Sequence, residues 1–127
     1  MRPSQTERYS RQIRLPQVGE AGQHRLLEAR VLIIGMGGLG SPVAMYLTAA
    51  GVGELVVSDY DRVDVSNLQR QIVHTHASIN ELKADSARET LLRLNPDVSV
   101  TTIDLSLIHI SAPTRRYASS YAVLCLK

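Results

Sequence analysis

The chain has 127 residues, 44% of them hydrophobic and 20% charged, which suits one globular domain and excludes two full domains or a disordered chain. No apolar run approaches the roughly 18 residues of a membrane span, and no apolar stretch follows the basic start, so we expect a cytoplasmic protein without a secretory signal. The net charge of +2 is too small to indicate nucleic acid or a membrane as a partner. One cysteine cannot form an internal disulfide.

The charge is unevenly distributed along the chain. Residues 105–127 hold three basic residues, no acidic ones and the single cysteine, Cys125, whereas residues 1–104 hold 11 basic and 12 acidic residues. We therefore divide the sequence into an N-terminal helical segment (residues 1–30), an α/β half-domain (residues 31–104) and a compositionally foreign tail (residues 105–127).

Two helices are predicted before the half-domain. The capping-box pattern Ser4-x-x-Glu7 predicts a short helix that ends at Pro16. Leucines among helix-forming residues predict a second helix over residues 20–30.

A βαβ unit follows. Four consecutive aliphatic residues before a glycine indicate a strand buried on both faces, and proline is tolerated in the first turn of the helix after it. The predicted elements are a strand at residues 31–34, a glycine-rich turn at 35–40, a helix from 41 to about 50, and a second strand at 54–58. The crossover between such parallel strands is almost always right-handed.

The second half of the sheet is predicted from weaker signals. Residues 61–73 are expected to form a loop or a brief helix capped by Asp64 or Ser66. A capping box at Ser78-x-x-Glu81 predicts a helix that Asn95-Pro96 terminates. The apolar face of this helix comprises Ile79, Leu82, Ala87, Leu91 and Leu94, and Val98, Val100 and Ile103 follow as a third strand. The fold class is therefore α/β, a Rossmann-like parallel sheet truncated after about three strands.

The glycine turn predicts a nucleotide site. Gly35-x-Gly37-x-x-Gly40 follows a strand and opens a helix, so its backbone can approach a phosphate while the helix N-terminus presents N–H groups to it. Asp59, at the end of the second strand, is placed to accept hydrogen bonds from a ribose, with Asp61 as an alternative. These features alone favour an NAD-dependent oxidoreductase, unless the glycines merely turn the chain.

Two cations further along the chain favour a different reaction. Arg70 and Lys83 follow the ribose position and could reach one phosphate chain. An enzyme that breaks a triphosphate neutralises the charge that develops on the leaving oxygens with such side chains. The alternative is that both are solvated surface charges.

Six segments together resemble a known family. They are 8–12 (Arg-Tyr-Ser-Arg-Gln), 35–41, 50–53 (Ala-Gly-Val-Gly), 59–61, 66–71 (Ser-Asn-Leu-Gln-Arg-Gln) with Lys83, and 94–96 (Leu-Asn-Pro). In this order they resemble the N-terminal part of the bacterial E1-like adenylyltransferases, which activate the sulfur carriers of molybdopterin and thiamine biosynthesis. The resemblance covers residues 7 to about 104.

The resemblance implies a reaction and the residues that perform it. The reaction is ATP-dependent adenylation of the C-terminal glycine of a small ubiquitin-like sulfur-carrier protein. The implied nucleotide-binding residues are Gly35, Gly37, Gly38, Gly40, Asp59, Asp61, Ser66, Asn67, Leu68, Gln69, Arg70 and Lys83. Arg70 and Lys83 are also implied to be catalytic, together with Arg11, which the family supplies from the partner subunit of a homodimer.

The family's metal ligands have no counterpart here. The resemblance implies Mg²⁺, held by an aspartate, and Zn²⁺, held by cysteine pairs, but the sequence at the expected magnesium position is Leu-Cys-Leu-Lys at residues 124–127. We therefore expect an active full-length parent and an inactive fragment. The tail looks like translated sequencing-adapter DNA, with a native end of the domain as the alternative. The remaining alternatives for function are an NAD-dependent oxidoreductase domain and a non-catalytic nucleotide-binding module.

The histidines are expected to have no role in the site. His74 and His76 have the spacing of a metal pair but no third ligand nearby, so we expect both at the surface or in a loop.

Overall fold

The structure is a computed structural model that describes residues 1–38, 40–103 and 122–126. Its elements occur in the order α1 (Pro3–Arg8), α2 (Ser10–Ile13), α3 (Gly19–Glu28), β1 (Arg30–Ile34), α4 (Gly40–Ala50), β2 (Glu54–Ser58), the 3₁₀ turns η1 (Val65–Asn67) and η2 (His76–Ser78), α5 (Lys83–Leu94), β3 (Ser99–Thr102) and β4 (Ala122–Leu126). In the described part of the chain, no helix is long and apolar enough to cross a membrane.

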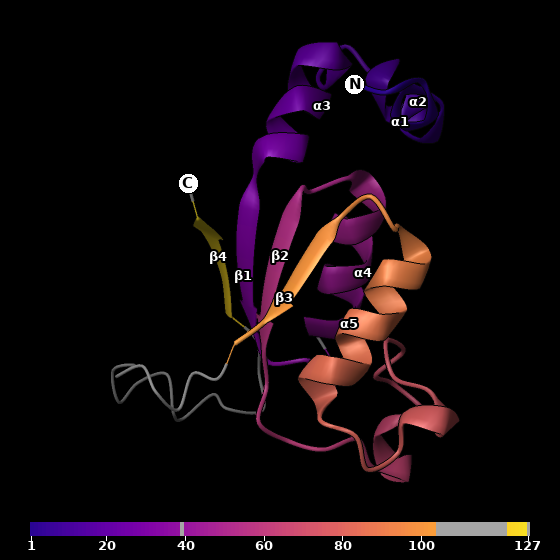
Figure 1. The fold of residues 1–127 in the computed structure, drawn as a ribbon, viewed down its shortest axis with the longest axis vertical. Coiled ribbons are helices and arrows are strands. Elements are labelled where there is room, and N and C mark those ends of the chain that lie inside the picture. Colours follow the sequence, from indigo (N-terminus) through magenta and orange to yellow (C-terminus); the bar gives the residue numbers. More distant parts are fainter. Residues whose placement is uncertain (39, 104–121, 127) are drawn as a thin grey trace.

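The strands form one sheet in the order β3-β2-β1-β4, and α4 and α5 cover one of its faces (Figure 1). β1, β2 and β3 are parallel, which confirms the predicted Rossmann-like parallel sheet of three strands. β4, from the tail, pairs antiparallel with β1 and places Cys125 opposite Val31. This fourth strand was not predicted. Its backbone pairs with the edge of β1 on the side away from β2.

The core lies between the sheet and the two covering helices. Val31 and Ile33 of β1 belong to the same buried cluster as Ala44 of α4 and Leu91 of α5. The alternate β1 residues, Leu32 and Ile34, are only partly buried, so burial on both faces was wrong as a prediction for this strand. Side chains alternate between the faces of a strand, and among the described helices only α4 and α5 cover this sheet, both on the same face (Figure 1).

Two predicted helix starts are also wrong. α1 begins at Pro3 rather than after Ser4, because Gln5 accepts a hydrogen bond from the Arg2 backbone N–H at 3.0 Å and Pro3 suits the first turn. The expected single helix ending at Pro16 is divided into α1 and α2 at Tyr9.

The second error concerns Ser78. Its hydroxyl donates to the Thr75 carbonyl at 2.8 Å and closes η2, so it does not cap a long helix. Asn80, with a φ of 75°, then turns the chain, and α5 begins only at Lys83. Ile79 and Leu82 consequently lie outside the helix, whereas Asn95 ends it as predicted.

The helix predicted over residues 20–30 ends at Glu28, because Arg30 already pairs with β2 as the first residue of β1, and β3 leaves out the predicted Val98 and Ile103. Three other boundaries agree with the sequence. β2 spans the predicted residues 54–58, α4 ends at Ala50, and Asp64 is the N-cap of η1, which resolves the choice between Asp64 and Ser66.

Candidate nucleotide site

The glycine turn lies where the carboxyl ends of β1 and β2 meet, at the lower end of the sheet in Figure 1. The Gly35 N–H donates to the Ser58 carbonyl at 2.7 Å, which joins the two strand ends. Gly35 has a φ of 93°, in the left-handed region that glycine adopts at least cost. The chain therefore turns here as the sequence predicts. Leu39, within the turn, lies outside the described residues.

Asp59 connects the glycine turn to the loop after β2. Its Oδ2 accepts a hydrogen bond from the Met36 N–H at 2.8 Å, and its Oδ1 accepts one from the Asp61 N–H at 2.8 Å. A carboxylate has about four acceptor positions, so Asp59 retains capacity for further donors such as ribose hydroxyls. Asp61 is exposed, and its carbonyl accepts from the Lys83 N–H at 2.8 Å. Both predicted acidic residues thus lie at this edge of the sheet.

Arg70 lies beside the glycine turn. A β-carbon at position 38 would be 3.9 Å from Arg70 Cδ, so the arginine passes over Gly38 at van der Waals distance. Its guanidinium is exposed, and Nη1 donates to the Ser66 carbonyl at 3.3 Å. Two residues 32 positions apart in sequence are therefore brought together.

Lys83 is the first residue of α5 and is buried, with 8% of its surface exposed. Among the described residues, the ion pairs are Arg2–Asp97 and Arg30–Glu54, so neither Lys83 nor Arg70 is paired with a carboxylate there. Buried lysines are rare unless they are paired. A largely enclosed lysine whose charge has no such partner is suited to an anionic ligand.

The start of α4 offers a third feature that suits an anion. Ser41 is fully buried, and its hydroxyl oxygen has no hydrogen-bond partner among the described residues. It lies in the first turn of α4, where backbone N–H groups carry the positive end of the helix dipole. The sequence assigned Ser41 only to the helix start.

The segment from Ser66 to Gln69 forms η1 and the turn after it. The Ser66 hydroxyl donates to the Asp64 carboxylate, and this hydrogen bond is the main cause that lowers the pKa of Asp64 from its usual value of 3.8. The Asn67 side-chain oxygen accepts from the Asp64 N–H at 3.0 Å. Leu68 is half-buried and Gln69 is exposed. This segment positions Arg70, but no hydrogen bond between described residues joins Gln69 to the glycine turn.

His74 is a member of the site that the sequence analysis missed. The sequence predicts it at the surface or in a loop; it lies in the loop between η1 and η2, but only 4% of it is exposed. Its Nε2 lies 2.9 Å from the Met36 carbonyl oxygen in the glycine turn, and its Nδ1 lies 2.8 Å from the Ser86 hydroxyl on α5. Burial lowers the pKa of His74 below its usual 6.5, and the nearby Lys83 acts in the same direction, whereas the Met36 carbonyl and Asp59 oppose them. No signal in the sequence separates His74 from the exposed His76.

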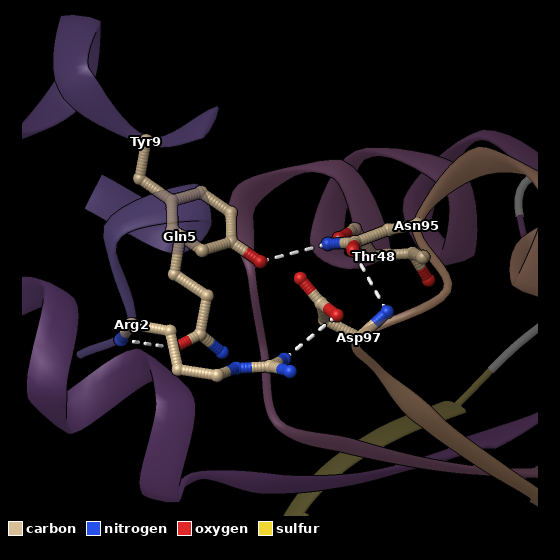
Figure 2. A network of polar contacts seen from close by, with 6 residues as sticks. All are labelled: Arg2, Gln5, Tyr9, Thr48, Asn95 and Asp97. Atoms are coloured by element: carbon tan, nitrogen blue, oxygen red, sulfur yellow. Dashed lines mark hydrogen bonds and ion pairs between the residues drawn. The ribbon is translucent and has the colours of Figure 1, made fainter. Parts of the chain in front are cut away.

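Arg11 lies far from the glycine turn of its own chain. It is an exposed residue of α2, which is packed at the opposite end of the sheet (Figure 1). Figure 2 shows the polar contacts that hold these N-terminal helices in place: the Arg2–Asp97 ion pair at 2.8 Å and the Asn95 amide, which donates to the Tyr9 hydroxyl at 2.8 Å. The contacts described above therefore bring Asp59, Asp61, Arg70 and Lys83 to the glycine turn, whereas Arg11 lies away from it.

The described residues do not fit a metal ion. Within residues 1–38, 40–103 and 122–126, no three His, Cys, Asp or Glu side chains are grouped as a metal site would require. The best-placed carboxylate, that of Asp59, already accepts two backbone N–H groups. Neither Mg²⁺ nor Zn²⁺ is therefore assigned to these residues.

Curated proteins with similar sequences act as adenylyltransferases. The chain is 52% identical over 101 residues to the SAMP-activating enzyme E1 of Haloferax volcanii, covering 80% of this chain and 37% of that protein. It is 50% identical over 100 residues to the sulfur carrier protein ThiS adenylyltransferase of Escherichia coli and 47% identical over 100 residues to the molybdopterin-synthase adenylyltransferase of Salmonella typhimurium, in each case covering 79% of this chain and 40% of the relative. The chain thus spans less than half the length of these relatives.

Solved structures show the same fold. The structure of PaaA matches with a TM-score of 0.75 and 32% identity over 91% of this chain and 37% of that one. That of E. coli MccB with ATP matches with a TM-score of 0.68 and 31% identity over 76% of this chain and 30% of that one.

The family model agrees with both sets of relatives and confirms the resemblance seen in the sequence. It matches residues 9–125, beyond residue 104, where we expected the resemblance to end, although residues 104–121 lie outside the described part. The chain belongs to the ThiF family.

Proposed function

We propose that this chain provides the nucleotide-binding half of an enzyme that uses ATP to adenylate the C-terminal glycine carboxylate of a small ubiquitin-like sulfur-carrier protein. The observation that carries the proposal is the pair of cations at the glycine turn. Arg70 lies over Gly38, and Lys83 is buried without a carboxylate partner among the described residues. A dinucleotide held by the glycine turn has little use for two further cations, whereas a triphosphate that is being cleaved needs them.

The chemistry is a displacement at the α-phosphorus of ATP. A carboxylate oxygen of the carrier's terminal glycine forms a bond to this phosphorus while the bond to the oxygen that bridges the α- and β-phosphates breaks. The products are an acyl-adenylate and pyrophosphate. Negative charge moves onto the pyrophosphate oxygens as they leave, so positioning and charge stabilisation supply most of the acceleration.

Each part of the site has a proposed task. Asp59 accepts the ribose hydroxyls, and the backbone of the turn, including Gly38, lies against the phosphates. Arg70 and Lys83 stabilise the charge on the transferred and leaving phosphates. The N-terminus of α4, with the unpartnered Ser41 hydroxyl, provides further donors.

Arg11 is proposed to act on a second copy of the chain. It is exposed, and its helix α2 lies at the opposite end of the sheet from the carboxyl ends of β1 and β2 (Figure 1), so it cannot join this site from within the same chain. A homodimer in which the two chains exchange this arginine would complete the cationic set of each site.

Binding of ATP to this chain tests the proposal. We expect isothermal titration calorimetry to show that ATP binds to the chain and that NADH binds weakly or not at all. Arg70→Ala and Lys83→Ala each remove a charge-assisted contact of about 1.5–3 kcal/mol and are expected to weaken ATP binding about 10- to 100-fold. Arg93→Ala is the matched control, because Arg93 is an exposed cation in the last turn of α5.

Two results would contradict the proposal. NADH binding without ATP binding would favour the oxidoreductase alternative. Unchanged ATP affinity in Arg70→Ala and Lys83→Ala would favour a non-catalytic nucleotide-binding module.

The reaction itself is measured by ATP–pyrophosphate exchange in the presence of a sulfur-carrier protein. We expect exchange from a full-length protein that contains these residues. We expect none from this chain alone, because its described residues offer no carboxylate set for magnesium.

A further inference from the structure

The backbone of Met36 in the glycine turn is held at both its N–H and its carbonyl group. Its N–H donates to Asp59 Oδ2 at 2.8 Å, and its carbonyl oxygen lies 2.9 Å from His74 Nε2. Asp59 comes from the end of β2, whereas His74 comes from the loop before α5. Two separate segments therefore fix the two peptide units on either side of the Met36 Cα, and His74 holds the one that it shares with Gly37.

The contacts of His74 determine its tautomer. A backbone carbonyl can only accept, so the Nε2 that faces Met36 must carry the proton. In neutral imidazole Nδ1 is then an acceptor, and it receives the proton of the Ser86 hydroxyl at 2.8 Å. Both ring nitrogens of the neutral side chain are thus used, and protonation at Nδ1 would abolish its ability to accept from Ser86.

The direction of the Met36 carbonyl sets the direction of the next N–H. No described peptide bond is cis, and in a trans peptide the C=O and the following N–H point in opposite directions. The Met36 carbonyl points to the buried His74, so the Gly37 N–H points away from it. Among the described residues, no hydrogen bond uses the Gly37 N–H.

Ser86 connects the same histidine to the helix that carries Lys83. Both residues are buried, and residues three apart lie on one face of a helix. His74 therefore lies between the glycine turn and the cationic end of α5.

From this geometry we propose that His74 is a positioning residue of the nucleotide site: it holds the Met36 carbonyl so that the Gly37 N–H faces the bound phosphates, and it braces α5 against the turn through Ser86. This inference rests on the proposed ATP site. His74 touches neither substrate nor reacting atoms, so its effect passes through the backbone.

Substitutions at His74 and at the neighbouring exposed histidine test the proposal. His74→Phe keeps a planar ring and removes both hydrogen bonds, and we expect it to weaken ATP binding at least 10-fold. His74→Gln restores an amide donor for the Met36 carbonyl, and we expect affinity within about threefold of the unsubstituted chain at pH 8. His76→Phe is the matched control, and we expect no change. Thermal unfolding of each variant identifies any variant that does not fold. The amide resonance of Gly37 in NMR spectra without nucleotide reports the environment of the Gly37 N–H, and we expect it to shift in His74→Phe.

The pH profile separates positioning from a merely structural role. Lys83 and Asp59 are the charged groups near His74, and Ser86 is its neutral partner. Protonation of His74 at acidic pH places a second positive charge near Lys83 and requires the Ser86 hydroxyl to accept from Nδ1 instead of donating to it, which disturbs the contact between α5 and the turn. ATP affinity should therefore fall more steeply below pH 6.5 in the unsubstituted chain than in His74→Gln. The titration of ATP itself is common to both proteins and cancels in the ratio. Ser86→Ala removes the hydrogen bond that stabilises neutral His74, so the fall in ATP affinity should begin at a higher pH.

The outcomes distinguish this inference from the proposed function. Absence of ATP binding by the unsubstituted chain overturns both. ATP binding that is the same in folded His74→Phe, or an unchanged Gly37 resonance in that variant, overturns the role of His74 alone. If His74→Phe does not fold, parallel pH profiles for His74→Gln, Ser86→Ala and the unsubstituted chain overturn it instead.

Discussion

The side-chain amide of Asn95 donates a hydrogen bond to the Tyr9 hydroxyl at 2.8 Å, across 86 positions of sequence (Figure 2). The same amide donates to the Thr48 carbonyl at 2.9 Å. Asn95 follows the end of α5, Thr48 belongs to the last turn of α4, and Tyr9 separates α1 from α2. One buried amide thus joins the N-terminal helices to the two helices that cover the sheet.

Removal of the Tyr9 hydroxyl should destabilise the fold. Tyr9 is 2% exposed, so Tyr9→Phe leaves a buried donor of Asn95 with one acceptor fewer, at an expected cost of about 1–3 kcal/mol. Urea unfolding measures the difference. Tyr46→Phe is the control, because Tyr46 is 77% exposed and should change the free energy of unfolding by less than about 0.5 kcal/mol. Equal effects of the two substitutions would contradict the role of the buried contact.

Gly51 should be intolerant of a side chain for two independent reasons. Its φ is 93°, and a β-carbon there would lie 2.6 Å from Tyr9 Cζ. Gly51→Ala should therefore cost about 2–5 kcal/mol, from backbone strain plus overpacking. Gly19 also has a positive φ, 61°, but open space around it, so Gly19→Ala should show only the strain of about 1–2 kcal/mol. Thermal or urea unfolding of both variants measures how much stability overpacking costs beyond backbone strain. A larger loss of stability in Gly19→Ala than in Gly51→Ala would refute the steric argument.

Two leucines of α5 should differ in how much they stabilise the fold, because one is buried and the other is exposed. Leu91 is fully buried, and Leu91→Ala should cost about 2–5 kcal/mol of unfolding free energy. Leu94 lies in the same helix at 38% exposure, and Leu94→Ala should cost about 1 kcal/mol or less. The prediction fails if urea unfolding ranks the two in the opposite order.

Stability should depend on pH through His74. Its pKa is lowered in the folded chain, chiefly by burial, so the unfolded chain binds a proton first as the pH falls below about 6.5. The contribution of neutral His74 to the free energy of unfolding is therefore fully present above pH 6.5. It is lost as the pH falls to the lower pKa that His74 has in the folded chain. Unfolding measured between pH 5 and pH 8 should show this loss in the unsubstituted chain and less of it in His74→Gln. An identical pH slope in both proteins would exclude His74 as its source.

The half-domain could be predicted from sequence where local signals and tertiary packing agree. The aliphatic run of β2 lies between glycines and Asp59, and the structure places its ends where predicted. Ser78 shows the opposite case, because a serine three residues before a glutamate suits a helix start as well as a 3₁₀ turn, and only the Thr75 contacts decide between them. β4 forms by pairing with β1, about 90 residues earlier in the chain, and a local sequence pattern does not predict such a distant pairing.

The site was predicted unevenly for the same reason. The glycines, Asp59, Arg70 and Lys83 form motifs that the resemblance identifies. His74 and the Ser41 hydroxyl matter because of burial and neighbours from distant segments, and these are properties of the folded chain.

The two hydrogen bonds to the Met36 backbone have a thermodynamic consequence. Fixing one residue's backbone costs about 1–2 kcal/mol in conformational entropy, and here that cost is met when the chain folds rather than when a ligand arrives. A preorganised turn binds its ligand with a smaller entropic penalty, because little remains to be ordered. The glycine turn would then keep the same conformation before and after a nucleotide binds.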